Sequence, residues 1–238
     1  MEEISREDEV ALLRDKYGGV APPDAWEEDL ARLRAGEPLA YVIGWVPFLG
    51  LKIGLDSHPL IPRPETEWWT NELIAHLKER FGDRSFTLLD LCAGSGAIGL
   101  GVLQQFPNAK VSFGEIVPEH VEQIRNNLER NNLDGTRADI RTSNLFESFH
   151  GVVEVLFDVI VSNPPYIPEE RELAASVTEF EPLEALFAGN DGLALITRIA
   201  QDAPKHLMPE GEIWVECDIA NIGAAKTLLD AFGAERMV

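Results

Sequence analysis

The sequence predicts an α/β protein built on a mostly parallel β-sheet with helices on both faces. Two observations support this prediction. From residue 86 onward, short apolar segments typical of buried strands alternate with segments of helical periodicity. The links between them are short, and parallel strands pair only when a crossing segment, usually a helix, joins them. The expected strands are 86–92, 109–115, 138–143, 157–162 and 211–217, and the expected helices are 96–106, 118–132, 192–207 and 222–233.

The chain before this sheet changes character twice. Residues 1–37 predict a short helical region. Residues 38–64 carry aromatic and β-branched residues broken by glycines, which predict a β-hairpin linker. Residues 65–238 form the expected main domain. That domain begins with a helix whose apolar positions recur at helical spacing, at Trp69, Leu73, Leu77 and Phe81.

The short helical region contains signals for two helices. Ser5, with Asp8 three residues later, is expected to cap the first helix, and Gly18 with Gly19 is expected to end it. Asp24 is expected to cap the second helix.

Composition limits the class of protein. The chain has 238 residues, of which 45% are hydrophobic and 26% charged, and its net charge is −21. Nucleic acids and anionic membranes attract Lys and Arg, so this charge argues against either as a partner and favours a protein partner. Two cysteines without metal-ligand spacing predict no disulfide framework and no metal site. We expect a cytoplasmic protein, monomeric, without a secretory signal or transmembrane helix.

A glycine-rich turn follows the first predicted strand of the sheet. Gly94, Gly96 and Gly99 form the pattern G-x-G-x-x-G, and Glu115 ends the next strand. Alone, this pattern is also the dinucleotide-binding fingerprint. Asp90 discriminates between cofactors, because its carboxylate would repel a pyrophosphate and attract an ammonium and a sulfonium. The spacing is typical of class I methyltransferases, which predicts S-adenosylmethionine as cofactor. The alternative role for Asp90 is a helix N-cap or a loop ion pair.

Two further strand ends carry polar residues. Asn144 follows the third strand and can accept from an adenine amino group, with Leu145 covering the ring, although an ordinary turn is the alternative. After the fourth strand, Asn163 and Pro164 offer two acceptor oxygens that can hold both hydrogens of an NH₂ group. Pro165 rigidifies the backbone, and Tyr166 can stack on a planar substrate. A strand ended by prolines is the structural alternative.

Five segments together resemble a known family. They are "GEPLAYVIG" (36–44), "LIPRPETE" (60–67), "LLDLCAGSGAIGL" (88–100), "DVIVSNPPYIP" (158–168) and "FEPLEALFAGNDGL" (180–193). The chain resembles the HemK/PrmC peptide chain release factor glutamine N5-methyltransferases, which are class I enzymes with a Rossmann-like fold. The resemblance covers about residues 36 to 232.

The resemblance implies roles for particular residues. The glutamine amide would bind at Asn163, Pro164, Pro165 and Tyr166. The ribose would bind at Glu115, and the adenine would lie between Asn144 and Leu145. Arg63, Glu65 and Glu67 would border the site or form ion pairs that lock a loop. The methionine part of S-adenosylmethionine would lie against Asp90, Cys92, Ala93, Gly94, Ser95 and Gly96, with Asn163 nearby.

Four features depart from the family pattern. Cys92 stands where the family has glycine, and we therefore expect no strained φ there. Asn144 replaces an aspartate. The helical region before residue 36 is short, which leaves open how a release factor would dock. After the last predicted helix only "GAERMV" remains, so we expect the C-terminal strands to be truncated.

The leading hypothesis is methyl transfer from S-adenosylmethionine to a protein glutamine, in the GGQ motif of a release factor. One alternative is a nucleic-acid methyltransferase acting on adenine N6, since N-P-P-Y also occurs in DNA adenine methyltransferases. A second is a non-catalytic homologue that binds the cofactor. A nicotinamide dehydrogenase is a distant further alternative.

Overall fold

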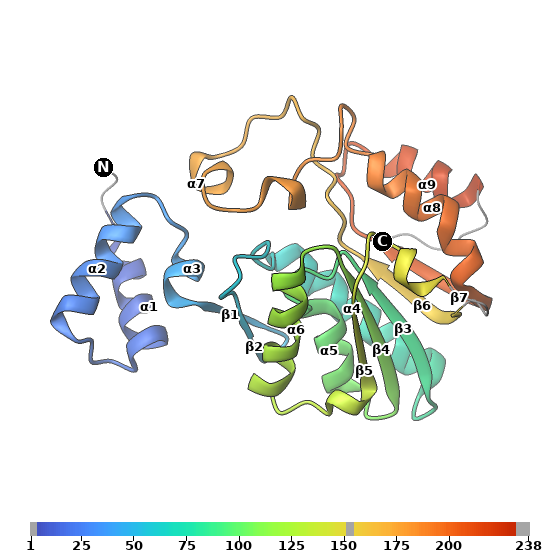
Figure 1. The fold of residues 1–238 in the computed structure, drawn as a ribbon, viewed down its shortest axis with the longest axis horizontal. Coiled ribbons are helices and arrows are strands. Elements are labelled where there is room, and N and C mark those ends of the chain that lie inside the picture. Colours follow the sequence, from blue (N-terminus) through green and yellow to red (C-terminus); the bar gives the residue numbers. More distant parts are fainter. Residues whose placement is uncertain (1–3, 151–154, 232–238) are drawn as a thin grey trace.

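The main domain is built on a five-stranded sheet in which all neighbouring strands are parallel, in the order β5-β4-β3-β6-β7 (Figure 1). The structure, a computed structural model, describes residues 4–150 and 155–231. The predicted α/β fold is thereby confirmed. The strands are β3 Phe86–Leu91, β4 Ala109–Glu115, β5 Ala138–Thr142, β6 Phe157–Ser162 and β7 Leu207–Val215.

Helices cover both faces of the sheet because successive apolar residues of each strand point to opposite sides. Leu88 and Val159 belong to one apolar core, whereas Leu89 and Ile160 belong to the other. The first core includes α4, α5 and α6, and the second includes α8 and α9. The five helices are α4 Pro64–Phe81, α5 Ala97–Gln105, α6 Pro118–Arg130, α8 Ala194–His206 and α9 Ile222–Ala231. Four apolar residues predicted to face the core from α4 are buried: Trp69, Leu73, Leu77 and Phe81.

Strand order reverses between β3 and β6, since β4 and β5 extend the sheet on one side of β3 and β6 and β7 on the other. At such a point two crossovers diverge and leave a crevice at the carboxyl ends of the strands. The long segment between β6 and α8 lies at this edge of the sheet (Figure 1). It contains three short elements or bridges: α7 Ala175–Thr178, the 3₁₀ turn η3 Leu183–Ala185, and the pairing of Ile167 with Phe187.

Residues 1–37 contain the two predicted helices, α1 Arg6–Tyr17 and α2 Pro23–Arg34. A third helix, α3 Leu39–Ile43, follows them. Ser5 caps α1 by accepting from the Asp8 backbone N–H, as predicted, and Gly18 ends it with φ 62°. The prediction that Asp24 caps α2 is wrong: Pro22 occupies the cap position and Pro23 the first turn, where its fixed φ suits a helix.

Part of the predicted linker is helical. α3 lies within 38–64, where strands were expected, because Val42 packs against Leu12 of α1 and Leu30 of α2. The remaining linker does form the predicted hairpin, from β1 Trp45–Phe48 and β2 Leu51–Gly54. Asn127 of α6 holds it to the main domain through two hydrogen bonds with the backbone of Gly54. Two short 3₁₀ turns complete the described elements: η1 Gly135–Arg137 and η2 Glu147–Phe149.

The predicted truncation falls on residues 232–238, which lie outside the described residues. Within the described residues, no helix combines the length and the apolar composition that crossing a membrane requires.

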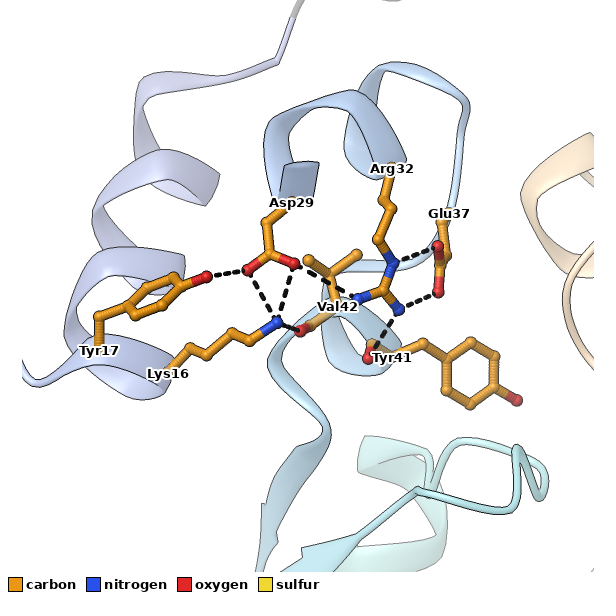
Figure 2. Close-up of polar contacts among 7 residues, drawn as sticks. All are labelled: Lys16, Tyr17, Asp29, Arg32, Glu37, Tyr41 and Val42. Atoms are coloured by element: carbon orange, nitrogen blue, oxygen red, sulfur yellow. Dashed lines mark hydrogen bonds and ion pairs between the residues drawn. The ribbon is translucent and has the colours of Figure 1, made fainter. Parts of the chain in front are cut away.

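A buried carboxylate joins the three N-terminal helices (Figure 2). Asp29 of α2 is 3% exposed. It accepts hydrogen bonds from Lys16 Nζ at 2.8 Å and Tyr17 Oη at 2.5 Å, both on α1, and from Arg32 at 3.4 Å. The same lysine also donates to the backbone oxygen of Val42 in α3, at 2.8 Å. Buried carboxylates are tolerated when they are paired in this way.

We expect Asp29→Ala to destabilise the three-helix region by about 3 kcal/mol, because it removes the carboxylate that pairs with the Lys16 ammonium and accepts from Tyr17, whereas Arg32 keeps its ion pair with Glu37. Hydrogen exchange of amides in α1, α2 and α3 should accelerate, while amides in β3 and β4 should keep their protection.

Glu28→Ala is the matched control, because Glu28 is the adjacent residue of the same helix and is exposed. Equal acceleration of exchange by both variants would show that Asp29 does not hold the helices together.

Candidate functional site

A cavity of about 230 Å³ lies at the crevice predicted from the strand order. The carboxyl ends of β3, β4, β5 and β6 all contribute to its wall. The residues from those strand ends are Cys92, Gly94, Gly114, Glu115, Ser143, Asn144, Leu145, Asn163 and Pro165. The segment between β6 and α8 adds Pro182, Glu184 and Ala185 to the wall, and α8 adds Leu195 and Arg198.

Glu115 connects two strand ends across the floor of this cavity. Its Oε2 accepts from the backbone N–H of Gly94 at 2.7 Å, and its Oε1 accepts from that of Val117 at 2.9 Å. The carboxylate therefore holds the turn after β3 against the end of β4. Each carboxylate oxygen can accept more than one hydrogen bond, so capacity remains for a ligand that donates hydroxyls.

In the turn after β3, every second residue from position 92 to 96 has a left-handed backbone conformation. Gly94 has φ 53° and Gly96 φ 80°. Cys92 has φ 56°, so the expectation of an unstrained φ at this residue is wrong. A side chain in this region clashes with its own carbonyl oxygen, which explains why glycine is the usual residue in the family pattern. Burial, with the Glu115 charge nearby, raises the pKa of the Cys92 thiol to about 12.

Asp90 is absent from the described lining of the cavity. Its side chain is fully buried, and Oδ2 accepts from the backbone N–H of Gly99 in the first turn of α5 at 2.9 Å. Gly96 and not Asp90 is the N-cap of α5, but the Asp90 carboxyl does satisfy one backbone N–H of that first turn. Oδ1 has no hydrogen-bond partner among the described residues. Burial raises the pKa of Asp90 to about 8, and contact between this carboxyl and a cofactor stays a prediction.

Asn144 and Leu145 lie at the rim after β5. Asn144 Oδ1 accepts from Arg198 of α8 at 3.1 Å, and its Nδ2 donates to Glu147 at 2.8 Å. The oxygen expected to meet adenine is thus already bound by a cation. Leu145 is buried with φ 53° and lines the cavity.

The turn after β6 contributes two of its four predicted residues to the wall. Asn163 and Pro165 line the cavity, whereas Pro164 and Tyr166 are absent from its described lining. Tyr166 instead donates from its hydroxyl to Glu216 at 2.9 Å. Ala93, Ser95 and Gly96 of the glycine turn are likewise absent from the wall.

Sequence reasoning missed several residues at the site, among them His120, Arg198 and Glu216. His120 of α6 lines the cavity, with Nδ1 2.9 Å from Ser57 Oγ, and burial lowers its pKa. In the sequence alone, Arg198 resembles any solvent-facing charged residue of an amphipathic helix. Glu216 follows β7 and accepts hydrogen bonds from two other segments. Nothing local in the sequence distinguishes them, because their partners are far away along the chain.

The segment 60–67 acts here through ion pairs and backbone contacts. Arg63 donates to Glu181 at 2.6 Å, and the Glu181 carboxylate also accepts from the backbone N–H of Ile61 at 3.2 Å. Glu67 accepts from the backbone N–H of Leu49 in the hairpin at 2.5 Å. These contacts agree with the alternative of a loop-locking set.

A larger cavity, of about 330 Å³, lies elsewhere, and none of the predicted site residues lines it. Its wall comes from the end of α4 and the turns before β3 and β4. Among the residues described, no group of three or more His, Cys, Asp or Glu side chains is arranged to hold a metal ion.

Comparison with known proteins shows which protein family this chain is similar to. Residues 67–180 match the family described as "Methyltransferase small domain". The release factor glutamine methyltransferase of Rhodopirellula baltica is 35% identical over 90% of this chain and 72% of its own length. That of Bordetella pertussis is 38% identical over 88% of this chain and 75% of its own.

Two solved structures share the fold. A methyltransferase from Pyrococcus furiosus has a TM-score of 0.54 and 21% identity, with 87% of this chain and 88% of that chain covered. A SAM-dependent methyltransferase from Agrobacterium tumefaciens has a TM-score of 0.52 and 12% identity, with 74% and 52% covered.

The fold, with its crevice at the strand-order reversal and its glycine turn, defines a class I S-adenosylmethionine-dependent methyltransferase. The chain belongs more particularly to the family of release factor glutamine methyltransferases.

Cys92 yields a direct test of the turn geometry. We expect Cys92→Gly to be more stable than Cys92→Ala by about 1 kcal/mol, because only glycine relieves the left-handed φ while both variants lose the thiol. Urea unfolding of the two variants measures the difference. An alanine variant as stable as the glycine variant would contradict the backbone strain assigned here.

Proposed function

We propose that this protein transfers a methyl group from S-adenosylmethionine to the side-chain amide nitrogen of a glutamine in a peptide chain release factor, within its GGQ motif. The observation that carries the proposal is the placement of Asn163 in the wall of the same cavity as Glu115 and Gly94. The relatives named above support the choice of substrate.

The cavity has the chemistry that this cofactor requires. Gly94 leaves open space where a Cβ would stand, so its backbone allows close approach of a ligand. In the proposal, Glu115 accepts from the ribose hydroxyls and Leu145 covers the adenine beside Asn144. The methionine part is proposed to lie against Cys92 and Gly94 of the wall, with Asp90, Ala93, Ser95 and Gly96 in the same strand end and turn. When bound, S-adenosylmethionine supplies an electrophilic methyl group on a positively charged sulfur.

The acceptor is proposed to bind at the turn after β6. The Asn163 side-chain oxygen and the Pro164 carbonyl accept the two N–H groups of the glutamine amide, Pro165 fixes the backbone, and Tyr166 lies against the planar amide. An amide nitrogen is a poor nucleophile because its lone pair is delocalised. Hydrogen bonds from its protons to fixed oxygens raise its electron density and orient the lone pair.

Charge is consistent with a protein substrate. The net charge of −21 opposes approach of a nucleic acid and permits a basic protein surface.

Incubation with S-adenosylmethionine labelled in the methyl group and purified release factors tests the proposal. We expect label on the glutamine of the GGQ motif, located by mass spectrometry of proteolytic peptides. A release factor with that glutamine changed to glutamate is the control and should stay unlabelled. Labelling of DNA or RNA in place of release factors would contradict the proposal. So would equal labelling of the unmodified release factor and of the variant that carries glutamate in its GGQ motif.

Two variants separate the acceptor and cofactor roles. Asn163→Ala should lower kcat about a hundredfold or more, because one of two fixed acceptors of the amide is lost. Glu115→Ala should instead weaken S-adenosylhomocysteine binding about tenfold to a hundredfold, because hydrogen bonds from the ribose to a charged acceptor are lost. Calorimetry gives the Kd and a labelled-methyl assay gives kcat.

The loss of rate should be specific to Asn163→Ala, and the loss of cofactor affinity should be specific to Glu115→Ala. Affinity for S-adenosylhomocysteine should stay near that of the unmodified protein in Asn163→Ala. If this variant loses affinity as much as rate, Asn163 does not act on the acceptor.

A further inference from the structure

A chain of hydrogen bonds runs from Glu216 through Thr66 to Asn163. Thr66 Oγ1 donates to Glu216 Oε2 at 2.7 Å, and Asn163 Nδ2 donates to Thr66 Oγ1 at 3.1 Å. The three residues come from the end of β7, the first turn of α4 and the end of β6. In the sequence, Thr66 is 97 positions from Asn163 and 150 positions from Glu216.

The direction of this chain follows from the protons available. A carboxylate has no proton to donate, so the hydrogen between Glu216 and Thr66 must belong to the threonine. A hydroxyl has only one hydrogen. Thr66 can therefore only accept from Asn163, and the asparagine must turn its NH₂ toward Thr66. Its side-chain oxygen is left as the end of the amide that is free to face the cavity.

Glu216 is itself held in place by donors only. The indole Nε1–H of Trp69 donates to the same oxygen at 2.6 Å, and the Tyr166 hydroxyl donates to the other oxygen at 2.9 Å. Burial and the Glu216 charge raise the pKa of Tyr166, so its hydroxyl stays protonated and can donate. The Glu216 backbone N–H also bonds to the Ser162 carbonyl at 3.0 Å, directly before Asn163.

Thr66 is shielded from water as well as bonded. It is 3% exposed, and Trp69 beside it is 5% exposed. Water cannot readily replace the Thr66 hydroxyl at such a position, so removal of the hydroxyl would leave the Asn163 amide free to rotate. A rotated amide would present NH₂ to the cavity, where it would repel an acceptor that also offers N–H groups.

We propose that Glu216 and Thr66 are positioning residues that fix the Asn163 amide with its oxygen toward the acceptor, and so select acceptors that donate N–H. This inference rests on the proposed function for the identity of the acceptor. The orientation of Asn163, however, is a property of the protein alone.

Thr66→Val removes the hydroxyl and keeps the shape, and Thr66→Ser keeps the hydroxyl. We expect Thr66→Val to lower kcat on release factor about tenfold to a hundredfold through misorientation, with the Kd for S-adenosylhomocysteine unchanged. Thr66→Ser should stay close to the unmodified protein. In the Asn163→Ala background, Thr66→Val should have no further effect, because the amide that it orients is gone.

A measurement without substrate keeps the inference separate from the proposed function. The side-chain NH₂ signals of Asn163, identified by their absence in Asn163→Ala, should show slow hydrogen exchange in the unmodified protein and in Thr66→Ser. They should exchange rapidly in Thr66→Val. If Thr66→Val does not fold, Thr66→Ala removes the hydroxyl without adding a methyl group beside Glu216.

The outcomes are distinct. An unmodified protein that labels no release factor overturns the proposed function, while exchange at Asn163 still tests the orientation. Equal exchange in Thr66→Val and the unmodified protein overturns the inference. So does an equal loss of kcat in Thr66→Val and Thr66→Ser, or full activity in Thr66→Val.

Discussion

Burial of both faces of one parallel sheet is the constraint on which the rest of this structure depends. Parallel strands need connections that return the chain across a face of the sheet, and most of them here contain a helix, so all carboxyl ends meet at one edge. The reversal of order between β3 and β6 opens that edge into a crevice, so that residues from four strand ends share one cavity of about 230 Å³. The chemistry of the site follows in large part from this topology, because Glu115, Asn144 and Asn163 all stand at or just after the carboxyl ends of strands.

Carboxylates that accept several hydrogen bonds then tie the elements around the crevice together. Glu115 joins the ends of β3 and β4, Glu181 holds Arg63 and the backbone of Ile61, and Glu216 gathers donors from α4 and from the turn after β6. Asp29 does the same for the three N-terminal helices. A carboxylate suits this role because it accepts several hydrogen bonds at once and donates none, which fixes the direction of every bond to it. Part of the large acidic content of this chain is therefore structural.

The left-handed turn after β3 shows how the site combines strain with support. Cys92 adopts a φ that favours glycine, and the Glu115 carboxylate bonds to the backbone of Gly94 two residues later. Bonds from the neighbouring strand thus hold a conformation that the local sequence alone disfavours. The same logic applies to Asn163, whose amide has two orientations of similar local energy and is held in one of them by Thr66.

Sequence periodicity determined the strands from Phe86 to Val215, the helices that cover them, and the edge at which Gly94, Glu115 and Asn163 lie. It could do so because alternation, helical spacing and turn chemistry act over a few neighbouring residues. Only the tertiary structure decided that residues 39–43 are helical and that Cys92 is left-handed. It also decided that Glu216, 150 positions from Thr66, completes the support of Asn163. Those outcomes depend on which distant elements the crossovers bring into contact, and no local pattern encodes that contact.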